Sequence, residues 1–554
     1  MKKKIIMSVL LCIPLIWGGF YEFVSAILIS TVAIAIIIRS KMSGKIEIEL
    51  SANSLLMAVI AVCLALSPTF AVDRGSAVIG IVKYMPVLLF YVLWQNLEQQ
   101  EKAYIWKFIP ISGAVIVCIS CLSYPITGLR DYFFRADRLG GFFQYSNTFA
   151  LYLLIGIILL QYREKLKKYE ITTLGILLFG IVITGSRSVF ILLVINVIFF
   201  FFYKKKWRAF YIKGIGIVGI AAVIAGAVTG QLETITRLFQ ISTHSSTLLG
   251  RILYWQDALP LIKEHPFGLG YLGYYYLQPQ IQTGDYIVKY IHNDWLQIAL
   301  DIGIIAIVAM LVLVIKNIIS KKNIGCNRHI LLLIALHCCL DFDIEFISIA
   351  LIGVMCLELG NAKKLMCKQQ IMYGAGAVIA LVGTYFTIAL GSTYFEEYHL
   401  ANQMYPYNTL SLESEMHNET DEKKQAQLAD KIMKQNGNRI SAYEINMKLD
   451  LEAEDYQQML IDGRKMLDYA GFDMEYYERY VVALSKGLDQ TLNQEDMENA
   501  QMLLEEIQGI PERINQLKER TSPLAYEIVD VPDFTMDESV EAYIENLSEI
   551  TLYE

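Results

Sequence analysis

One polar stretch, Gln231–Gly303, contains His265-Pro266-Phe267-Gly268-Leu269-Gly270 and, near its end, His292-Asn293-Asp294-Trp295. A long apolar run stops just before it, at Thr229-Gly230, and the next apolar run begins near Trp295. Polar, aromatic and cationic side chains are therefore gathered in one connection, residues 231–293, between two candidate membrane spans. We expect the chemistry of the protein to lie there.

Apolar runs dominate the rest of residues 1–392. Of the 554 residues, 55 % are hydrophobic, which is too many for a soluble protein of this length. Runs of about 15 to 25 apolar residues recur, and about 20 suffice for a helix to cross a bilayer. The predicted fold is therefore all-α, a polytopic membrane helical bundle. We predict thirteen spans, near 5–20, 23–38, 52–70, 77–94, 106–124, 147–161, 171–185, 187–203, 212–229, 294–316, 329–341, 345–360 and 372–391.

Lysines and arginines indicate how these spans are oriented, because short cytoplasmic loops carry an excess of them. The basic clusters fall in alternate connections: Lys2–Lys4, Arg39–Lys45, Arg163–Lys168, Lys204–Arg208, Lys316–Arg328 and Lys363–Lys368. We therefore expect the N-terminus in the cytoplasm and, with an odd number of spans, the C-terminus outside. The outer face then holds the connections 125–146, 184–188, 231–293 and 341–345.

Residues 393–554 differ from the rest in charge. They contain 13 basic and 35 acidic residues, whereas residues 1–392 contain 34 basic and 20 acidic ones. Comparable helix starts at Asn408, Ala442 and Tyr476 are each 34 residues apart, the period of tetratricopeptide-like helical hairpins. We predict an extracytoplasmic, α-helical, TPR-like domain that docks an acceptor or a protein partner and is dispensable for the reaction itself. Its acidity fits a solvated surface better than a cation-binding role.

The nine cysteines indicate neither disulfides nor a metal site. All of them precede Thr393, in or beside apolar runs, and none lies between Gln231 and Ile291. Cys118 and Cys121 have the spacing of a metal-binding pair but sit inside a predicted span. No metal and no cofactor are expected.

Six arginines occupy the outer face, where the orientation rule disfavours cations: Arg130, Arg135, Arg138, Arg187, Arg237 and Arg251. Each alone fits a side chain that reaches toward a lipid headgroup, but six together favour an anionic ligand. Arg187 lies in Thr184-Gly185-Ser186-Arg187-Ser188, which joins two apolar runs with almost no loop. A guanidinium at this place can bind a phosphate with two parallel hydrogen bonds.

Two further motifs contain arginines. Arg138 opens Arg138-Leu139-Gly140-Gly141, and Asn147 follows at the start of a span, where we expect it to cap the helix. Arg251 and Trp255 are four residues apart, so they share one face of a predicted short helix. An indole beside a guanidinium suits a sugar phosphate, although aromatic residues at this depth also serve as interface anchors.

His292 is the candidate general base. It stands where the outer connection meets a span, with Asn293 or Asp294 placed to cap the helix. The positive end of a helix dipole favours the neutral imidazole, which can accept a proton near pH 7. The alternative is a surface histidine that makes a capping contact. His337 and Asp341 are four residues apart, which fits either a pair that supports the site or a structural polar pair inside the bundle.

Four segments in this order resemble the superfamily of O-antigen ligases and O-antigen polymerases. They are Arg138…Asn147, Thr184-Gly185-Ser186-Arg187, Arg251…Gly303 and His337…Asp341-Phe342-Asp343. The resemblance implies a helical membrane fold of GT-C-like type, with its active site outside the bacterial cytoplasmic membrane. It also implies a polyprenyl-pyrophosphate-linked glycan donor and a metal-independent mechanism.

Carried onto this sequence, the resemblance assigns donor pyrophosphate binding to Arg187 and Arg251, and less securely to Arg138. It assigns activation of the acceptor hydroxyl to His292. Trp255 is expected to contact the substrate, and the tyrosines between Tyr271 and Tyr276 to form a groove that stacks on sugars. Family ligases have about twelve spans. The thirteenth span and the exported domain predicted here depart from that pattern, so the resemblance does not identify the acceptor.

The sequence predicts a glycosyltransferase that polymerises or ligates cell-surface polysaccharide, with polymerase as the first choice and ligase as the second. Transfer to protein, by an O-linked oligosaccharyltransferase, is a third variant. A transporter or binding protein for lipid-linked glycan predicts charges near the bilayer midplane instead. A purely structural anchor would leave the outer arginines unexplained. No nucleic-acid partner is expected.

Overall fold

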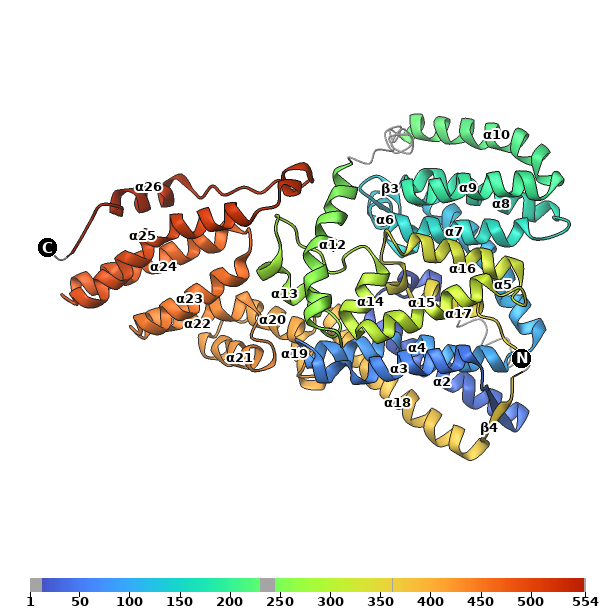
Figure 1. Cartoon of the computed structure of the whole chain (residues 1–554), viewed down its shortest axis with the longest axis horizontal. Helices are drawn as coiled ribbons and strands as arrows, with labels where there is room; N and C mark the ends of the chain where they lie inside the picture. Colours follow the sequence, from blue (N-terminus) through green and yellow to red (C-terminus); the bar gives the residue numbers. More distant parts are fainter. Residues whose placement is uncertain (1–11, 230–244, 361, 553–554) are drawn as a thin grey trace.

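The computed structural model describes residues 12–229, 245–360 and 362–552. Within these ranges the chain is almost entirely helical, with two short antiparallel strand pairs. Figure 1 shows two parts: a body of helices that run side by side, and a stack of C-terminal helices beyond one end of that body. The helices α12, α13 and α14 lie between these two parts.

Five helices of the described ranges are long and apolar enough to cross a membrane: α2 (Glu22–Ser43), α3 (Ala52–Phe70), α4 (Arg74–Asn96), α5 (Gln99–Ser123) and α18 (Gln369–Tyr394). The apolar helices α7 (Ser146–Gln161), α9 (Arg187–Tyr203) and α15 (Ile304–Ile319) are shorter. The body also contains α8 (Lys168–Thr184), α10 (Lys205–Thr229), α16 (Gly325–His337) and α17 (Ile347–Met355). An all-α membrane protein is therefore confirmed, whereas the count of thirteen spans remains a prediction.

Three of the expected spans are not single long helices. In the first, expected near 5–20, the described residues form the 3₁₀ turns η1 (Ile13–Leu15) and η2 (Trp17–Gly19), since Gly18 and Gly19 adopt positive φ. The span expected at 294–316 is split into α14 (Asp294–Ile302) and α15. The span expected at 345–360 contains η5 (Asp343–Glu345) and the nine residues of α17.

Gly303 causes the break between α14 and α15. Its φ is +89°, and a Cβ atom there would lie 2.7 Å from the carbonyl oxygen of Pro266. The segment Pro266–Gly270 runs beside the break: the amide of Ile304 donates to Pro266 O and that of Leu269 to Leu300 O. Only glycine fits so close a backbone approach at this φ. The glycine motif of the outer connection thus packs on the end of α14, the nine-residue helix that begins directly after His292 and Asn293.

The basic connections lie together at one end of the body. Strands β1 (Lys45–Glu49) and β4 (Lys364–Lys368) pair there. Lys204 and Lys206 donate to carbonyls of the loop after α7, and Arg39 pairs with Glu98 at the start of α5. This grouping is the one that the alternating charge pattern predicts. The side of the membrane on which each end lies stays a prediction.

The C-terminal part consists of α19 (Tyr398–Met404), α20 (Thr409–Asn418), α21 (Glu422–Gln435), α22 (Ile440–Glu452), α23 (Tyr456–Ala470), α24 (Met474–Asn493), α25 (Met497–Arg520), the turn η6 (Pro523–Glu527) and α26 (Glu538–Leu547). Consecutive helices pack against each other, around one apolar core shared by α22–α26 and a second one shared by α20, α21 and α22. Asn408, Asp421, Asp455 and Asp473 each cap a helix through the side chain. Stacked hairpins are the form that the 34-residue period predicts. Their identity as TPR-like repeats stays a prediction, as does the domain boundary at residue 393.

This C-terminal part also packs on the outer connection. The turn η6 contacts α12 (Ser246–Glu264), and α23 contacts α13 (Gly273–Ile281). The amide of Ser522 donates to the carbonyl of Thr283 at 2.8 Å. Arg439 lies over the ring of Tyr276, 5.0 Å from its centroid. The two parts therefore share an interface beside the candidate site.

Candidate functional site

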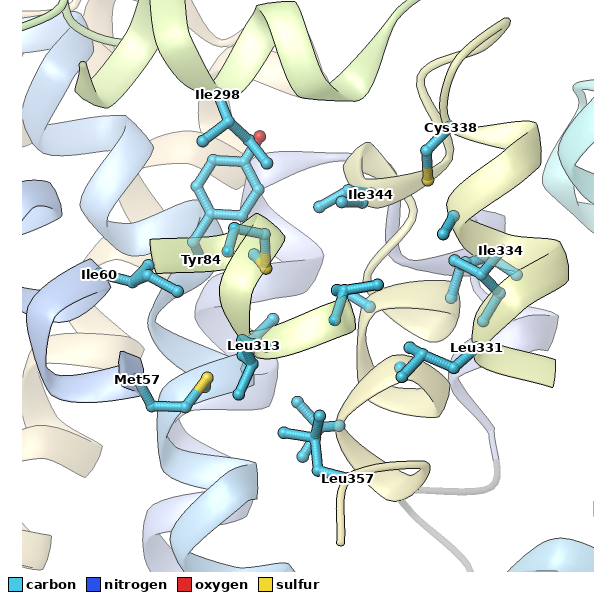
Figure 2. A pocket seen from close by; sticks show the side chains of 18 of the residues that line it. Met57, Ile60, Tyr84, Ile298, Leu313, Leu331, Ile334, Cys338, Ile344 and Leu357 are labelled. Carbon is cyan, nitrogen blue, oxygen red and sulfur yellow. The ribbon is translucent and has the colours of Figure 1, made fainter. Parts of the chain in front are cut away.

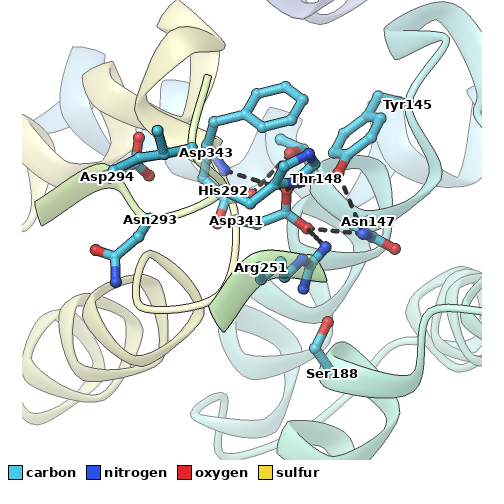
Figure 3. A network of polar contacts seen from close by, with 12 residues as sticks. Tyr145, Asn147, Thr148, Ser188, Arg251, His292, Asn293, Asp294, Asp341 and Asp343 are labelled. Atoms are coloured by element: carbon cyan, nitrogen blue, oxygen red, sulfur yellow. Dashed lines mark hydrogen bonds and ion pairs between the residues drawn. The ribbon is translucent and has the colours of Figure 1, made fainter. Parts of the chain in front are cut away.

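The centre of the site is Asp341, in the turn that follows α16 (Figure 3). Its side chain is fully buried, at 0 % exposure. Arg251 Nη2 lies 3.3 Å from one carboxylate oxygen, and His292 Nδ1 lies 3.2 Å from the other. Tyr145 donates a hydrogen bond of 2.6 Å and Asn147 one of 2.7 Å. A buried carboxylate needs this number of partners to offset its loss of hydration.

Arg251 reaches Asp341 from α12. Leu249, Leu253 and Leu261 bury the inner side of this helix, and the Arg251 side chain is 12 % exposed. Asp257, two turns further along α12, accepts hydrogen bonds from the amide and hydroxyl of Thr283 and from the hydroxyl of Tyr286. Burial raises the pKa of Asp257 although these three bonds act to lower it. The bonds fix α12 against the rest of the outer connection, and with it the position of Arg251.

His292 adopts a strained backbone conformation directly before α14. Its φ is +52°, which is unfavourable for a residue with a Cβ atom and is common at functional sites. Asn293 is the helix cap, as expected, and accepts from the amides of Trp295 and Leu296. The capping alternative for His292 is therefore wrong: its ring packs edge-on against Phe342, at 4.9 Å, and its Nδ1 contacts Asp341.

The contact with Asp341 determines what His292 can do. An ionised carboxylate only accepts hydrogen bonds, so the proton of the imidazole is held on Nδ1. The lone pair then lies on Nε2, on a side chain that is 23 % exposed. This is the tautomer that a general base requires.

Arg138 is joined to the same carboxylate through one intermediate residue. It lies in the hairpin of β2 (Phe134–Arg135) and β3 (Arg138–Leu139). Its Nε donates to the carbonyl of Thr184 and its Nη2 to Asn147 Oδ1 at 2.6 Å. The expectation that Asn147 caps a helix is wrong, because its side chain links Arg138 to Asp341 while α7 begins after Tyr145 without a side-chain cap.

Arg187 is the first residue of α9. Gly185 ends α8 in the left-handed conformation, with φ +61°, so the chain reverses within two residues. Ser186 is the N-cap of α9, yet its side chain makes no capping hydrogen bond. The N-terminus of α9, which carries the positive end of the helix dipole, therefore lies where Arg187 stands, and this favours an anion there.

A second hydrogen-bonded chain begins one residue further on. Ser188 Oγ lies 2.9 Å from His337 Nε2, and His337 Nδ1 contacts Asp343 Oδ2. Thr148 donates to the other oxygen of Asp343 at 2.7 Å. The sequence paired His337 with Asp341 because they are four residues apart. The structure instead pairs His337 with Asp343, since α16 ends at His337 and the chain turns before Asp341.

The aromatic residues of the outer connection are not placed as the sequence suggested. Trp255 donates from its indole nitrogen to the carbonyl of Ile291 at 2.8 Å, next to His292. Tyr271 and Tyr276 are buried and hydrogen-bond to Glu22 and Ser76 respectively. The expectation of an open groove lined by Tyr271–Tyr276 is therefore wrong. Trp255 supports the backbone that carries His292, and any contact with substrate stays a prediction.

Arg130 and Arg135, two further arginines of the expected outer face, are not among the residues that contact the Asp341 side chain. Arg130 pairs with Asp131 and Arg135 is exposed, while Arg237 falls outside the described residues.

Among described residues, the buried Asp294, Cys338 and Asp343 offer ligand atoms within 4.8 Å of one another. Both oxygens of Asp343 already contact Thr148 and His337, and Asp294 accepts from the amide of Ile344. This cluster is explained as part of the hydrogen-bonded support of the site.

A large apolar cavity lies beside the site (Figure 2). It is lined by side chains of α3, α4, α14, α15, α16 and α17, among them Met57, Tyr84, Ile298 and Leu313, and by Leu357, which follows α17. Cys338 and Ile344, which flank the Asp341 turn, complete its wall. Apolar space therefore adjoins the polar network, as a site for an amphiphilic substrate requires.

Comparison with protein families identifies one match. Residues 172–311 match a family model described as O-antigen ligase. The matched segment extends from α8 to α15 and contains Arg187, Arg251, Trp255 and His292. Among curated proteins, a search gives no match.

Proposed function

We propose that this chain, a membrane protein of the O-antigen ligase superfamily, transfers a glycan from a polyprenyl-pyrophosphate carrier to an acceptor hydroxyl outside the cytoplasmic membrane. The family and the apolar helices support a membrane protein that polymerises or ligates polysaccharide. The donor, the mechanism and the residue roles are our proposals. The observation that carries them is the contact of one buried carboxylate, Asp341, with both Arg251 and His292.

His292 acts as the general base in this proposal. The acceptor hydroxyl loses its proton to Nε2 while its oxygen attacks the anomeric carbon of the donor sugar. Asp341 keeps the ring oriented and stabilises the imidazolium that forms, as a buried carboxylate does behind a catalytic histidine. General-base catalysis of this kind contributes about 10²–10⁴-fold to rate.

Arg187 and Arg251 bind the pyrophosphate. As the bond between the anomeric carbon and the phosphate oxygen breaks, its electron pair stays on the phosphate, and fixed guanidiniums stabilise the developing charge. The dipole of α9, whose first residue is Arg187, favours negative charge at the same place. Arg138 acts through Asn147 and Asp341 and positions the other groups. No metal or cofactor is part of this scheme.

Inhibition by inorganic pyrophosphate tests the arginine assignment, in an assay with purified lipid-linked donor and acceptor. Arg187→Ala and Arg251→Ala should each weaken inhibition at least tenfold, and Arg187→Lys should recover little because lysine lacks the planar fork. Arg130→Ala is the matched control, an arginine of the same face paired with Asp131. Wild-type inhibition in both alanine variants would refute the assignment.

The acceptor distinguishes three products of the same chemistry. We propose a polymerase first and a ligase second, with an O-linked protein oligosaccharyltransferase as the alternative. Deletion of the gene gives short glycan chains in the first case and full-length chains left on the carrier lipid in the second. Loss of glycan from a protein fraction identifies the third. Unchanged glycan in all three pools would point to a transporter or binding protein instead.

A further inference from the structure

The turn Asp341-Phe342-Asp343 supports two separate hydrogen-bonded chains. Asp341 leads to His292 and Arg251, and Asp343 leads through His337 to Ser188. The proposed mechanism uses only the first chain. The second consists of Thr148, Asp343, His337 and Ser188, and its two central members are fully buried.

The buried end of this chain fixes the charge on His337. Asp343 is 0 % exposed and contacts the imidazole directly. A carboxylate at such a place is costly unless a cation neutralises it, and the ring is the group that faces it. A protonated ring donates from both nitrogens, so Nδ1–H is directed to Asp343 and Nε2–H to Ser188 Oγ.

This arrangement orients the Ser188 hydroxyl. A serine oxygen that accepts a hydrogen bond from an imidazole keeps its own proton for another acceptor. Ser186 Oγ lies 3.3 Å from Ser188 Oγ, a long hydrogen bond that a charged phosphate oxygen would displace. Ser188 is the second residue of α9, next to Arg187, and its side chain is only half-buried. Figure 3 shows Ser188 on the side of Arg251 away from Asp294.

We propose that Ser188 is a leaving-group contact of the glycosyl transfer, with its hydroxyl positioned by His337 and Asp343 to donate to the departing pyrophosphate. This inference rests on the proposed function. The acceptor oxygen bonds to the anomeric carbon, the carbon–oxygen bond to phosphate breaks, and His292 takes the acceptor proton. Ser188 keeps its own proton, and its hydrogen bond strengthens as negative charge develops on the phosphate oxygen.

The roles of the two chains are therefore opposite. The chain through Asp341 removes a proton from the acceptor, and the chain through Asp343 stabilises the charge on the leaving group. Ser188 is the catalytic residue of the second chain, since it contacts the reacting group. His337 and Asp343 are positioning residues, because they act through Ser188.

Three substitutions of Ser188 test the proposal in the full-length protein. Ser188→Ala should lower kcat about tenfold and weaken inhibition by inorganic pyrophosphate several-fold, with KM for the acceptor unchanged. Ser188→Thr keeps the hydroxyl and should restore both values. Ser188→Cys, a weak donor, should resemble alanine. Ser123→Ala, at the end of α5, is the matched control.

The outcomes separate this inference from the proposed function. If the arginine variants lose pyrophosphate inhibition while Ser188→Ala behaves like wild type, the leaving-group role of Ser188 is wrong and the function stands. If neither the arginine nor the serine variants affect inhibition, the proposed function fails as well. A glycosylated Ser188, found by mass spectrometry after a single turnover, would overturn the contact role in favour of a covalent intermediate.

The positioning role of His337 has its own readout. A buried histidine removed outright can destabilise the fold, so its variants are compared with Ser188→Ala by a double-mutant cycle. His337→Gln combined with Ser188→Ala should lower kcat no further than Ser188→Ala alone. Additive losses in protein of unchanged thermal stability would show that His337 acts independently of Ser188.

Discussion

At the scale of single residues, the site depends on which side chains contact the two buried carboxylates, Asp341 and Asp343. Asp341 contacts Arg251 and His292, and Asp343 contacts His337, although only Phe342 separates the two aspartates. Both side chains are fully buried, so each needs hydrogen-bond partners to offset its loss of hydration. The positive φ of His292 adds a local strain that the surrounding contacts must offset.

Replacement of Asp341 by Asn tests the contacts of this carboxylate with Arg251 and His292. The amide is similar in size but pairs less well with Arg251 and no longer fixes the proton on Nδ1 of His292. We expect kcat to fall about 10²–10⁴-fold, as for loss of the base itself. In the double variant with His292→Ala, turnover should match that of His292→Ala alone, because both residues serve one step. Multiplicative losses would assign Asp341 a separate role.

Asp450, on α22, gives a prediction for pH. Burial and the neighbouring Asp462 raise its pKa to about 7 in the folded protein, from a usual value of 3.8. The folded state therefore binds this proton more tightly than the unfolded state, and stability is lost as pH rises from about 4 to about 7. Asp450→Asn should raise Tm at pH 8 and have less effect at pH 5. An equal gain at both pH values would contradict the assignment.

At the scale of elements, α12 connects the catalytic residues to the C-terminal part. Ala525 of η6 and the following Ile528 are buried against Leu249, Leu253 and Tyr286. A Cβ atom on Gly250, the residue before Arg251, would lie 3.9 Å from Ile528. The sequence alone predicts a C-terminal domain that is dispensable for the reaction. Because η6 of this domain contacts α12, we expect the domain to support the placement of Arg251.

Ile528→Asp tests this support without removing the domain. A carboxylate in the apolar cluster should displace η6 from α12 and raise KM for the donor several-fold, with a smaller change in kcat. Ile528→Val should behave like wild type, because it keeps the apolar contact. Val529→Asp, an exposed neighbour, is the control for added charge. Wild-type donor kinetics in Ile528→Asp would show that Arg251 is positioned without η6.

The elements also show what the sequence can and cannot predict. Apolar runs identify the long helices, and Asn293 caps α14 as its residue type indicates. The break between α14 and α15 at Gly303 depends on the close approach of the Pro266 backbone. The buried Tyr271 depends on its hydrogen bond to Glu22. These contacts join residues far apart in the chain, so local spacing could not reveal them. For the same reason, spacing alone assigned His337 to the wrong aspartate.

At the scale of the whole molecule, basic residues gather at one end of the helical body and the candidate site at the other. Lys206 donates to Glu164 O, and Lys364 pairs with Glu47, all at the end opposite the Asp341 turn. Arg251, His292 and the C-terminal helices lie at or beyond the other end. The body therefore has the charge asymmetry that orients membrane proteins.

Protease added to intact spheroplasts tests the orientation. It should remove the C-terminal part, residues 393–554, and leave an epitope at Lys204–Arg208 protected until the membrane is opened. A known outer-face protein confirms that the protease is active. Survival of the C-terminal part beside a cleaved control would place this part in the cytoplasm and reverse the assignment of the site.

The rate of glycosyl transfer in His292→Ala, measured beside its donor affinity and thermal stability, tests the central claim most directly. Removal of the base should lower kcat about 10²–10⁴-fold. Donor affinity should change little, because Arg187 and Arg251 remain, and the protein should stay folded. Turnover within a few-fold of wild type, in protein that binds donor normally, would contradict the account and show that another group removes the acceptor proton.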